Sequence, residues 1–88
     1  MENPAIRNLL SFIQQDLDTD VHGEELDGYS HIICPTLPFD IFIYKKFTER
    51  PGVSDKRYIL ISLGQLEQEG TKIKNRLKVL AGKAKKLH

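Results

Sequence analysis

Two apolar stretches in the middle of the chain, residues 39–47 and 56–63, set the fold class. Both are rich in the β-branched and aromatic residues that suit a pleated sheet. Between them lie Pro51 and Gly52. Proline presets the first central dihedral of a turn, and glycine accepts the positive φ that a type II turn needs next. The sequence therefore predicts two adjacent strands joined as a hairpin with Pro51-Gly52 in its loop.

The N-terminal residues predict a helix over about residues 4–17. Asn3 and Pro4 suit the N-cap and the first helical position. Apolar residues then recur every three or four positions and form one stripe: Ile6, Leu9, Leu10, Ile13 and Leu17. Residues 18–30 form a polar connection in which Leu26 is a possible anchor into the core. A further strand is expected at about residues 29–34, where Pro35 and Pro38 then stop it.

The C-terminal segment predicts a long helix over about residues 65–87. Its apolar residues form a narrow stripe: Leu66, Ile73, Leu77, Leu80, Ala84 and Leu87. Gly70 interrupts this stripe and could divide a short first turn from the main helix. The expected order is α-β-β-β-α. This is an α+β fold with a three-stranded antiparallel sheet and one domain that covers residues 1–88.

Both faces of the expected sheet carry apolar side chains. Alternation places Phe39, Ile41 and Ile43 on one face, together with Ile59 and Ile61. The opposite face carries Phe42 and Tyr44 from one strand and Tyr58 and Leu60 from the other. A sheet that packs on one side alternates apolar with polar residues. Either helices cover both faces, or one face is left for another molecule.

The net charge of +1 conceals a strong asymmetry along the chain. Residues 1–27 carry a net charge of −6, residues 28–70 carry none, and residues 71–88 carry +7. Such a division can serve an outside partner, or the two ends can neutralise each other. The total charge therefore does not indicate a partner.

The composition predicts a small globular protein of the cytoplasm. A chain of 88 residues has room for one core. No apolar run approaches the roughly 18 residues of a membrane span. The N-terminal residues do not have the pattern of a signal peptide. The single Cys34 cannot form an internal disulfide, which favours a reducing compartment.

No motif in the sequence indicates catalysis, a metal or a cofactor. Asp18-x-Asp20-x-His22-Gly23 matches the opening of a calcium-binding loop, but Tyr29 stands where a bidentate glutamate should close the site. We expect a solvated acidic turn there. His31 and Cys34 are three residues apart on an expected strand, so their side chains point to opposite faces. No serine lies in a nucleophile motif, and no glycine spacing suits a phosphate.

The first functional hypothesis is therefore a non-enzymatic protein-interaction module. Its partner would be another protein or a second copy of the chain, and a small regulator or inhibitor of a larger complex fits this size. Aromatic side chains dominate binding energy at interface centres. The expected anchors are Phe42, Tyr44, Tyr58 and Leu60.

The second hypothesis is nucleic-acid binding through the basic hairpin tip and the basic C-terminal helix. Cations neutralise phosphates, and aromatic rings stack on unpaired bases. The candidate residues are Lys45, Lys46, Arg50, Lys56, Arg57, Lys74 and Lys78. A membrane is a weaker candidate partner, because the apolar stripe of the C-terminal helix is narrow and lacks Trp and Phe. No small-molecule substrate is inferred.

Overall fold

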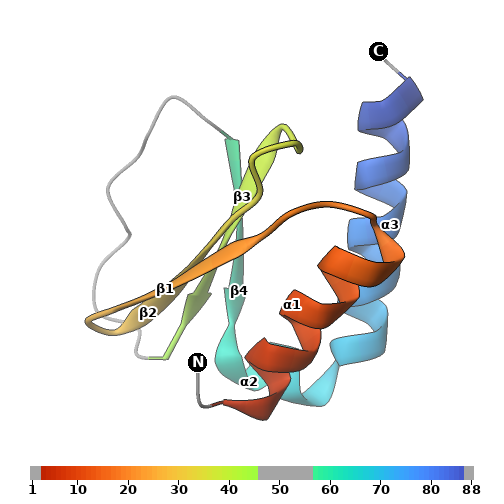
Figure 1. Ribbon diagram of the computed structural model, residues 1–88. Helices are drawn as coiled ribbons and strands as arrows, with labels where there is room; N and C mark the ends of the chain where they lie inside the picture. Colours follow the sequence, from red (N-terminus) through yellow and green to blue (C-terminus); the bar gives the residue numbers. More distant parts are fainter. Residues whose placement is uncertain (1–2, 46–56, 87–88) are drawn as a thin grey trace.

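The computed structural model describes residues 3–45 and 57–86 and has an α+β fold (Figure 1). Its elements follow in the order α1 (Pro4–Asp16), β1 (His22–Leu26), β2 (Tyr29–Ile33), β3 (Phe39–Tyr44), β4 (Arg57–Ser62), α2 (Leu63–Gln68) and α3 (Gly70–Lys86). The expected fold class is confirmed. The expected three-stranded antiparallel sheet is wrong in two respects, since the sheet has four strands and is mixed.

Helix α1 begins as the sequence predicts. The Asn3 side chain accepts hydrogen bonds from the backbone N–H groups of Ala5 and Ile6, and Pro4 takes the first helical position. An N-cap of this kind satisfies donors that have no partner inside the helix. The apolar stripe of α1 is buried, with Ile6, Leu9 and Ile13 fully shielded from solvent.

Strand β1 occupies residues that the sequence analysis treated as a polar connection. It pairs antiparallel with β2, and Leu26 lies opposite Tyr29, so Asp27 and Gly28 alone form the hairpin loop. Gly28 has φ 82°, which glycine adopts without steric cost. An Asp-Gly pair between two strands is a strong hairpin signal. Leu26 is 41% exposed and does not anchor the core.

Strands β3 and β4 are parallel, which contradicts the predicted hairpin. Phe39 lies opposite Arg57, and Tyr44 lies opposite Ser62. A two-residue turn cannot join parallel strands, because the chain must return to the other end of the sheet before it pairs. The Pro51-Gly52 turn lies outside the described residues. Strand β2 pairs antiparallel with β3, and the sheet order is β1-β2-β3-β4.

The C-terminal helical segment is divided as Gly70 suggested. Ser62 caps α2 with a reciprocal capping box in which its hydroxyl accepts from the Gln65 N–H and its own N–H donates to the Gln65 side chain. Helix α2 ends at Gln68, and α3 begins at Gly70. The predicted single helix is therefore two helices.

Among the described residues, the hydrophobic core cluster lies on one side of the sheet. All three helices pack on this side, as the edge-on view of the sheet shows (Figure 1). The core joins apolar residues from the helices and from the inward-facing strand positions: Ile6, Leu9, Ile13, Ile32, Ile41, Ile43, Ile61, Leu66 and Leu77. Within residues 3–45 and 57–86, no helix covers the other side of the sheet. We call that side the open face.

Candidate interaction surface

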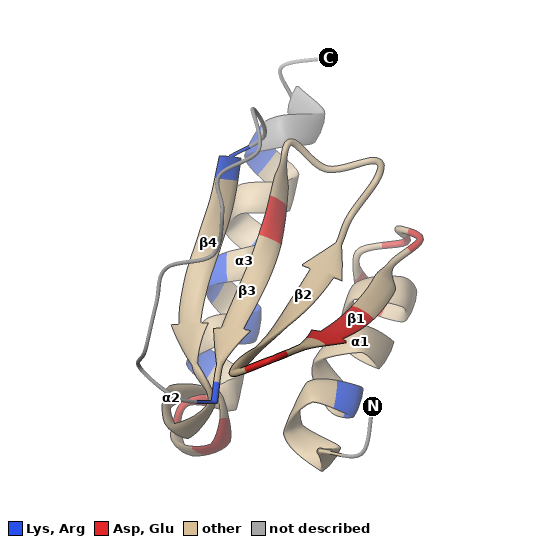
Figure 2. Cartoon of the chain, turned by 90° about the vertical axis from the view of Figure 1, so that its left-hand side faces the viewer, with Lys and Arg blue, Asp and Glu red and all other residues tan. Residues whose placement is uncertain are grey.

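Six residues from strands β2, β3 and β4 form a cluster on the open face. The strand register brings them together, because Tyr29 lies opposite Tyr44, His31 opposite Phe42, and Phe42 opposite Leu60. Residues that pair directly across strands share a face. The members of this open-face cluster are Tyr29, His31, Phe42, Tyr44, Tyr58 and Leu60. Figure 2 looks onto this face, with the sheet in front of the helices.

Phe42 is the centre of the cluster. The His31 ring stacks on it with ring centroids 4.3 Å apart and planes inclined by 9°. Tyr58 meets the Phe42 ring edge-on at 5.6 Å, and Tyr29 lies 5.7 Å from it at a tilted angle. Such aromatic pairs contribute about 0.5–1.5 kcal/mol beyond their buried area. The cluster is therefore an ordered aromatic surface with a defined geometry.

A hydrogen-bonded pair fixes the His31 ring. His31 Nε2 lies 2.9 Å from Asp40 Oδ2, and Asp40 Oδ1 accepts a hydrogen bond of 3.1 Å from the Cys34 backbone N–H. Asp40 is 7% exposed, and Cys34 is fully buried. The carboxylate thereby joins the end of β2 to the start of β3. We infer that the Asp40 carboxylate positions the His31 ring and the end of β2.

Exposure differs across the cluster. Leu60 is 36% exposed, whereas Phe42 is 8% exposed beneath its aromatic neighbours. The three tyrosines and His31 are partly exposed. Phe42 is buried, yet it does not belong to the helix-side core. The apolar surface is thus continuous and only partly shielded.

The structure brings together the four anchors expected from the sequence, Phe42, Tyr44, Tyr58 and Leu60, on one face. Sequence reasoning missed Tyr29 and His31, which complete the cluster. The signal that could have found them is the alternation along β2: Ser30 and Ile32 are fully buried, so Tyr29 and His31 point to the open face.

A groove lies beside this face, along the outer edge of β4. It has a volume of about 340 Å³ and separates β4 from α3. We call it the edge groove. Its apolar lining comes from Ile59, Leu60, Ile61, Ile73 and Leu77, and its charged lining from Glu69, Lys72 and Arg76.

Of the residues expected at a basic hairpin tip, the structure describes Lys45 and Arg57, and these two lie apart. Lys45 follows the end of β3 and lies 3.4 Å from Glu25, whereas Arg57 begins β4 at the opposite end of the parallel pair. Lys46, Arg50 and Lys56 lie outside the described residues.

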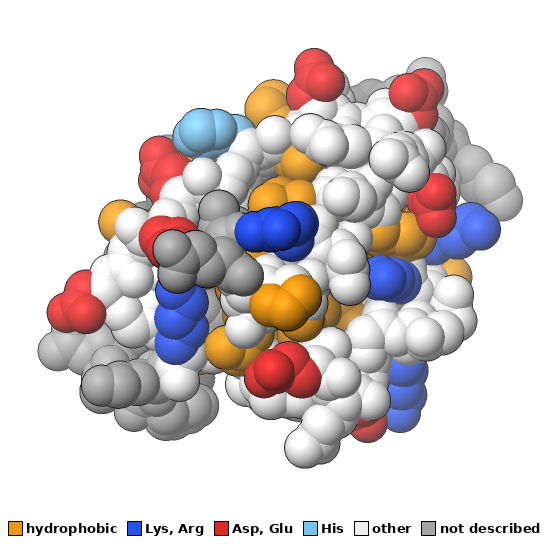
Figure 3. Space-filling view, turned by 60° about the horizontal axis from the view of Figure 1, so that its bottom comes forward, with side chains coloured by type: hydrophobic (Ala, Val, Ile, Leu, Met, Phe, Trp, Pro, Cys, Tyr) orange, Lys and Arg blue, Asp and Glu red, His pale blue; other side chains and the backbone are white. Residues whose placement is uncertain are grey.

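Two lysines of α3 complete that set. Lys74 Nζ lies 5.9 Å from the Phe12 ring centroid of α1, and Lys78 is exposed. In Figure 2, Lys and Arg positions of α3 lie behind the sheet, and acidic positions are visible on β1. The end of the molecule viewed in Figure 3 carries charged side chains of both signs around hydrophobic ones.

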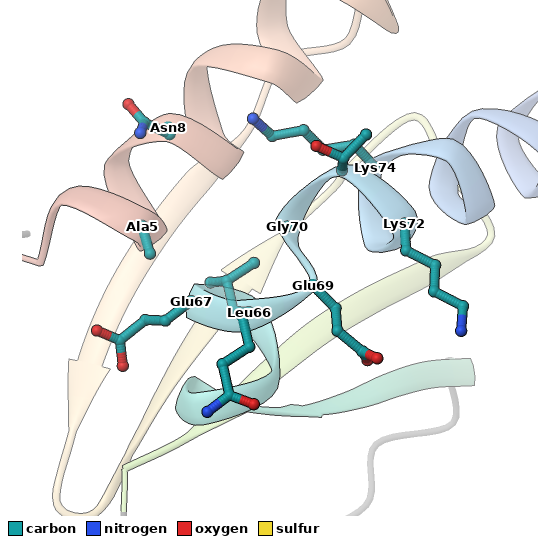
Figure 4. A pocket seen from close by; sticks show the side chains of 10 residues that line it. Ala5, Asn8, Leu66, Glu67, Glu69, Gly70, Lys72 and Lys74 are labelled. Atoms are coloured by element: carbon teal, nitrogen blue, oxygen red, sulfur yellow. The ribbon is translucent and has the colours of Figure 1, made fainter.

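A second, larger pocket lies where α1, α2 and the start of α3 meet (Figure 4). Its volume is about 540 Å³. Glu67, Glu69, Lys72 and Lys74 supply charges of both signs, and the lining contains no His or Cys. We assign no catalytic chemistry to this pocket.

Other classes of site lack support in the described part of the chain. No three or more His, Cys, Asp or Glu side chains are grouped there to hold a metal ion. None of the described helices is long and apolar enough to cross a membrane. None of the family models, curated proteins or solved structures compared with the chain matches it. The surface is therefore interpreted from its own geometry and chemistry.

Proposed function

We propose that this protein is a non-enzymatic interaction module that binds another protein through the open-face cluster. The observation that carries the proposal is that all three helices pack on one side of the sheet while an aromatic cluster occupies the other. Contiguous apolar surface on a small protein is typical of a binding site. A role as a small regulator or inhibitor of a larger complex belongs to this proposal.

The composition of the cluster suits a protein partner. Tyrosine combines a large apolar ring with a polar hydroxyl and loses little conformational entropy on binding, because it has two side-chain torsions. Tyr44 and Tyr58 lie on either side of Leu60, which contributes exposed aliphatic surface. Stacking against Phe42 and the bond to Asp40 hold His31 in place, so part of the surface is ordered before binding.

A location in the cytoplasm is part of the same proposal. Its support is the single Cys34 of the sequence, which lies in the hydrophobic core. Secreted proteins of this size usually depend on several disulfides.

The experiment compares two aspartate substitutions at exposed apolar positions. Leu60→Asp alters the open face, and Val79→Asp alters α3, where Val79 is 57% exposed. Tagged full-length protein and both variants are used to isolate partners, and each partner is then purified and titrated against the three proteins. We expect Leu60→Asp to weaken binding at least tenfold, or by about 1.4 kcal/mol, and Val79→Asp to leave it unchanged.

Sedimentation of the purified chain separates the two kinds of protein partner. A dimer that Leu60→Asp dissociates and Val79→Asp preserves would identify a second copy as the partner. Partners that bind all three proteins equally would refute the open-face proposal.

A further inference from the structure

The two outer strands of the sheet differ in how their edges are protected. Strand β1 carries Gly23, Glu24 and Glu25 within five residues. Charged residues on an edge strand discourage pairing with another chain, and glycine weakens the strand. Strand β4 has no charge, proline or glycine from Tyr58 to Ser62. In the described part of the sheet, no strand pairs with the outer side of β4.

The edge groove gives this unprotected edge a shape that can receive side chains. Ile59 and Ile61 share the helix side of β4, and they face Ile73 and Leu77 across the groove. A strand added beside β4 would direct every second side chain to the same side. Apolar residues at those alternate positions would enter the groove.

The charges around the groove favour an acidic occupant. Lys72 and Arg76 line it, and Glu69 is the acidic residue of its lining. Arg57, at the start of β4, is exposed and adds a further positive charge at that end of the edge. Complementary charge at an interface speeds association and selects the partner.

A second copy of the chain fits this site poorly. Two β4 strands paired antiparallel about a twofold axis would place both α3 helices on the same side of the joined sheet. Lys72 and Arg76 of the two copies would then approach one another, and like charges in contact oppose association.

Strand β1 of another copy is also a poor occupant of the edge groove. It has acidic residues but lacks apolar residues at the positions that would enter the groove. Gly23 and Glu25 occupy its helix-side positions, since they lie opposite Ile32 and Ser30, which are buried on that side. Neither residue can fill the apolar groove.

We propose that the outer edge of β4 and the edge groove bind an extended segment of a partner protein, which adds as a strand and carries apolar residues at alternate positions with acidic residues beside them. Strand addition of this kind takes its affinity from main-chain hydrogen bonds and its specificity from alternate side chains. This site shares Leu60 with the open-face cluster, but it does not depend on the function proposed for that cluster.

The test uses two labelled peptides and the full-length protein. Each peptide has ten residues with valine at alternate positions; one has glutamate between the valines and the other has lysine. Fluorescence anisotropy at low salt should give the glutamate peptide an affinity about tenfold higher than that of the lysine peptide. Arg76→Glu should abolish this preference. Lys78→Glu makes the same change of charge on α3 outside the groove and should preserve it.

Amide NMR signals of the same protein locate the binding site. Addition of the glutamate peptide should shift the signals of Tyr58–Ser62 and leave those of β1 unchanged. The proposal is overturned if neither peptide binds at millimolar concentration, if both bind equally, or if Arg76→Glu has no effect. Shifts confined to the open face, or self-association through β4 without peptide, would also overturn it.

Discussion

Leu60 and Ile61 are neighbours on β4 whose side chains lie on opposite faces of the sheet, so alanine substitutions at the two positions compare what each face contributes to stability. Ile61 is 6% exposed and belongs to the helix-side core, whereas Leu60 is 36% exposed on the open face. Both substitutions remove a branched aliphatic side chain of the same size.

The expected difference follows from the exposure of the two side chains. Truncation of a buried isoleucine or leucine costs about 2–5 kcal/mol, because it removes apolar contacts and leaves a cavity. We expect about 3 kcal/mol for Ile61→Ala. Full burial of a leucine side chain contributes about 1.5–3 kcal/mol. Leu60 retains solvent contact and leaves no closed cavity, so Leu60→Ala should cost about 1 kcal/mol.

Urea unfolding at 25 °C measures both changes in the free energy of unfolding. The slope of the free energy of unfolding against urea concentration should be the same for the two variants and the parent protein. The difference in stability then appears in the urea concentration at the midpoint of unfolding. Equal losses of about 3 kcal/mol at both positions would mean that Leu60 is a core residue. The open face would then stabilise the fold and would not be left for a partner.

Three further substitutions test local parts of the fold, each by thermal unfolding, in which 1 kcal/mol shifts Tm by about 4–8 °C in a domain of this size. Asp40→Ala leaves the buried Cys34 N–H without the Asp40 acceptor and should cost about 2 kcal/mol of stability. Asp40→Asn retains an acceptor oxygen and should cost less. An equal loss of stability in both variants would contradict the role of the hydrogen bond between Cys34 and Asp40. Gly28→Ala places a side chain at φ 82° and should cost about 1 kcal/mol; an unchanged Tm would mean that the hairpin tolerates another turn. Ser62→Ala removes the capping box of α2 and should cost about 1 kcal/mol, whereas Ser54→Ala, outside the described residues, serves as a comparison of the same chemical change.

Local sequence signals predicted the elements that depend on local chemistry. Asn3 and Pro4 mark the start of α1, and Gly70 marks the division between α2 and α3. The alternation along residues 39–44 and 57–62 correctly separated Ile41 and Ile61 from Phe42 and Leu60. These features could be predicted because capping and side-chain alternation are set by neighbours in the sequence.

The missed strand and the wrong pairing have different causes. Strand β1 contains Glu24 and Glu25, which are uncommon in strands, and its partner β2 rather than its own composition holds it in the sheet. The Asp27-Gly28 pair was a local signal for this hairpin that the sequence analysis did not use. The parallel pairing of β3 and β4 depends on how the chain returns between them, and the composition of two apolar strands does not encode that direction.

The candidate site was predicted in part for the same reason. Phe42, Tyr44, Tyr58 and Leu60 share a face whether their strands run parallel or antiparallel, because alternation alone sets the face. The contacts of Phe42 with Tyr29 and His31 depend on the register of β2 with β3, which the sequence does not give.

Solvent paramagnetic relaxation in NMR measures whether the open face is accessible to another molecule in the isolated chain. A soluble gadolinium complex broadens the methyl signals of exposed side chains. We expect strong broadening for Leu60, comparable to that of Val79 on α3, and little for Ile43 and Ile61 in the core. A Leu60 methyl signal as protected as that of Ile43 would mean that the open face is closed to a partner.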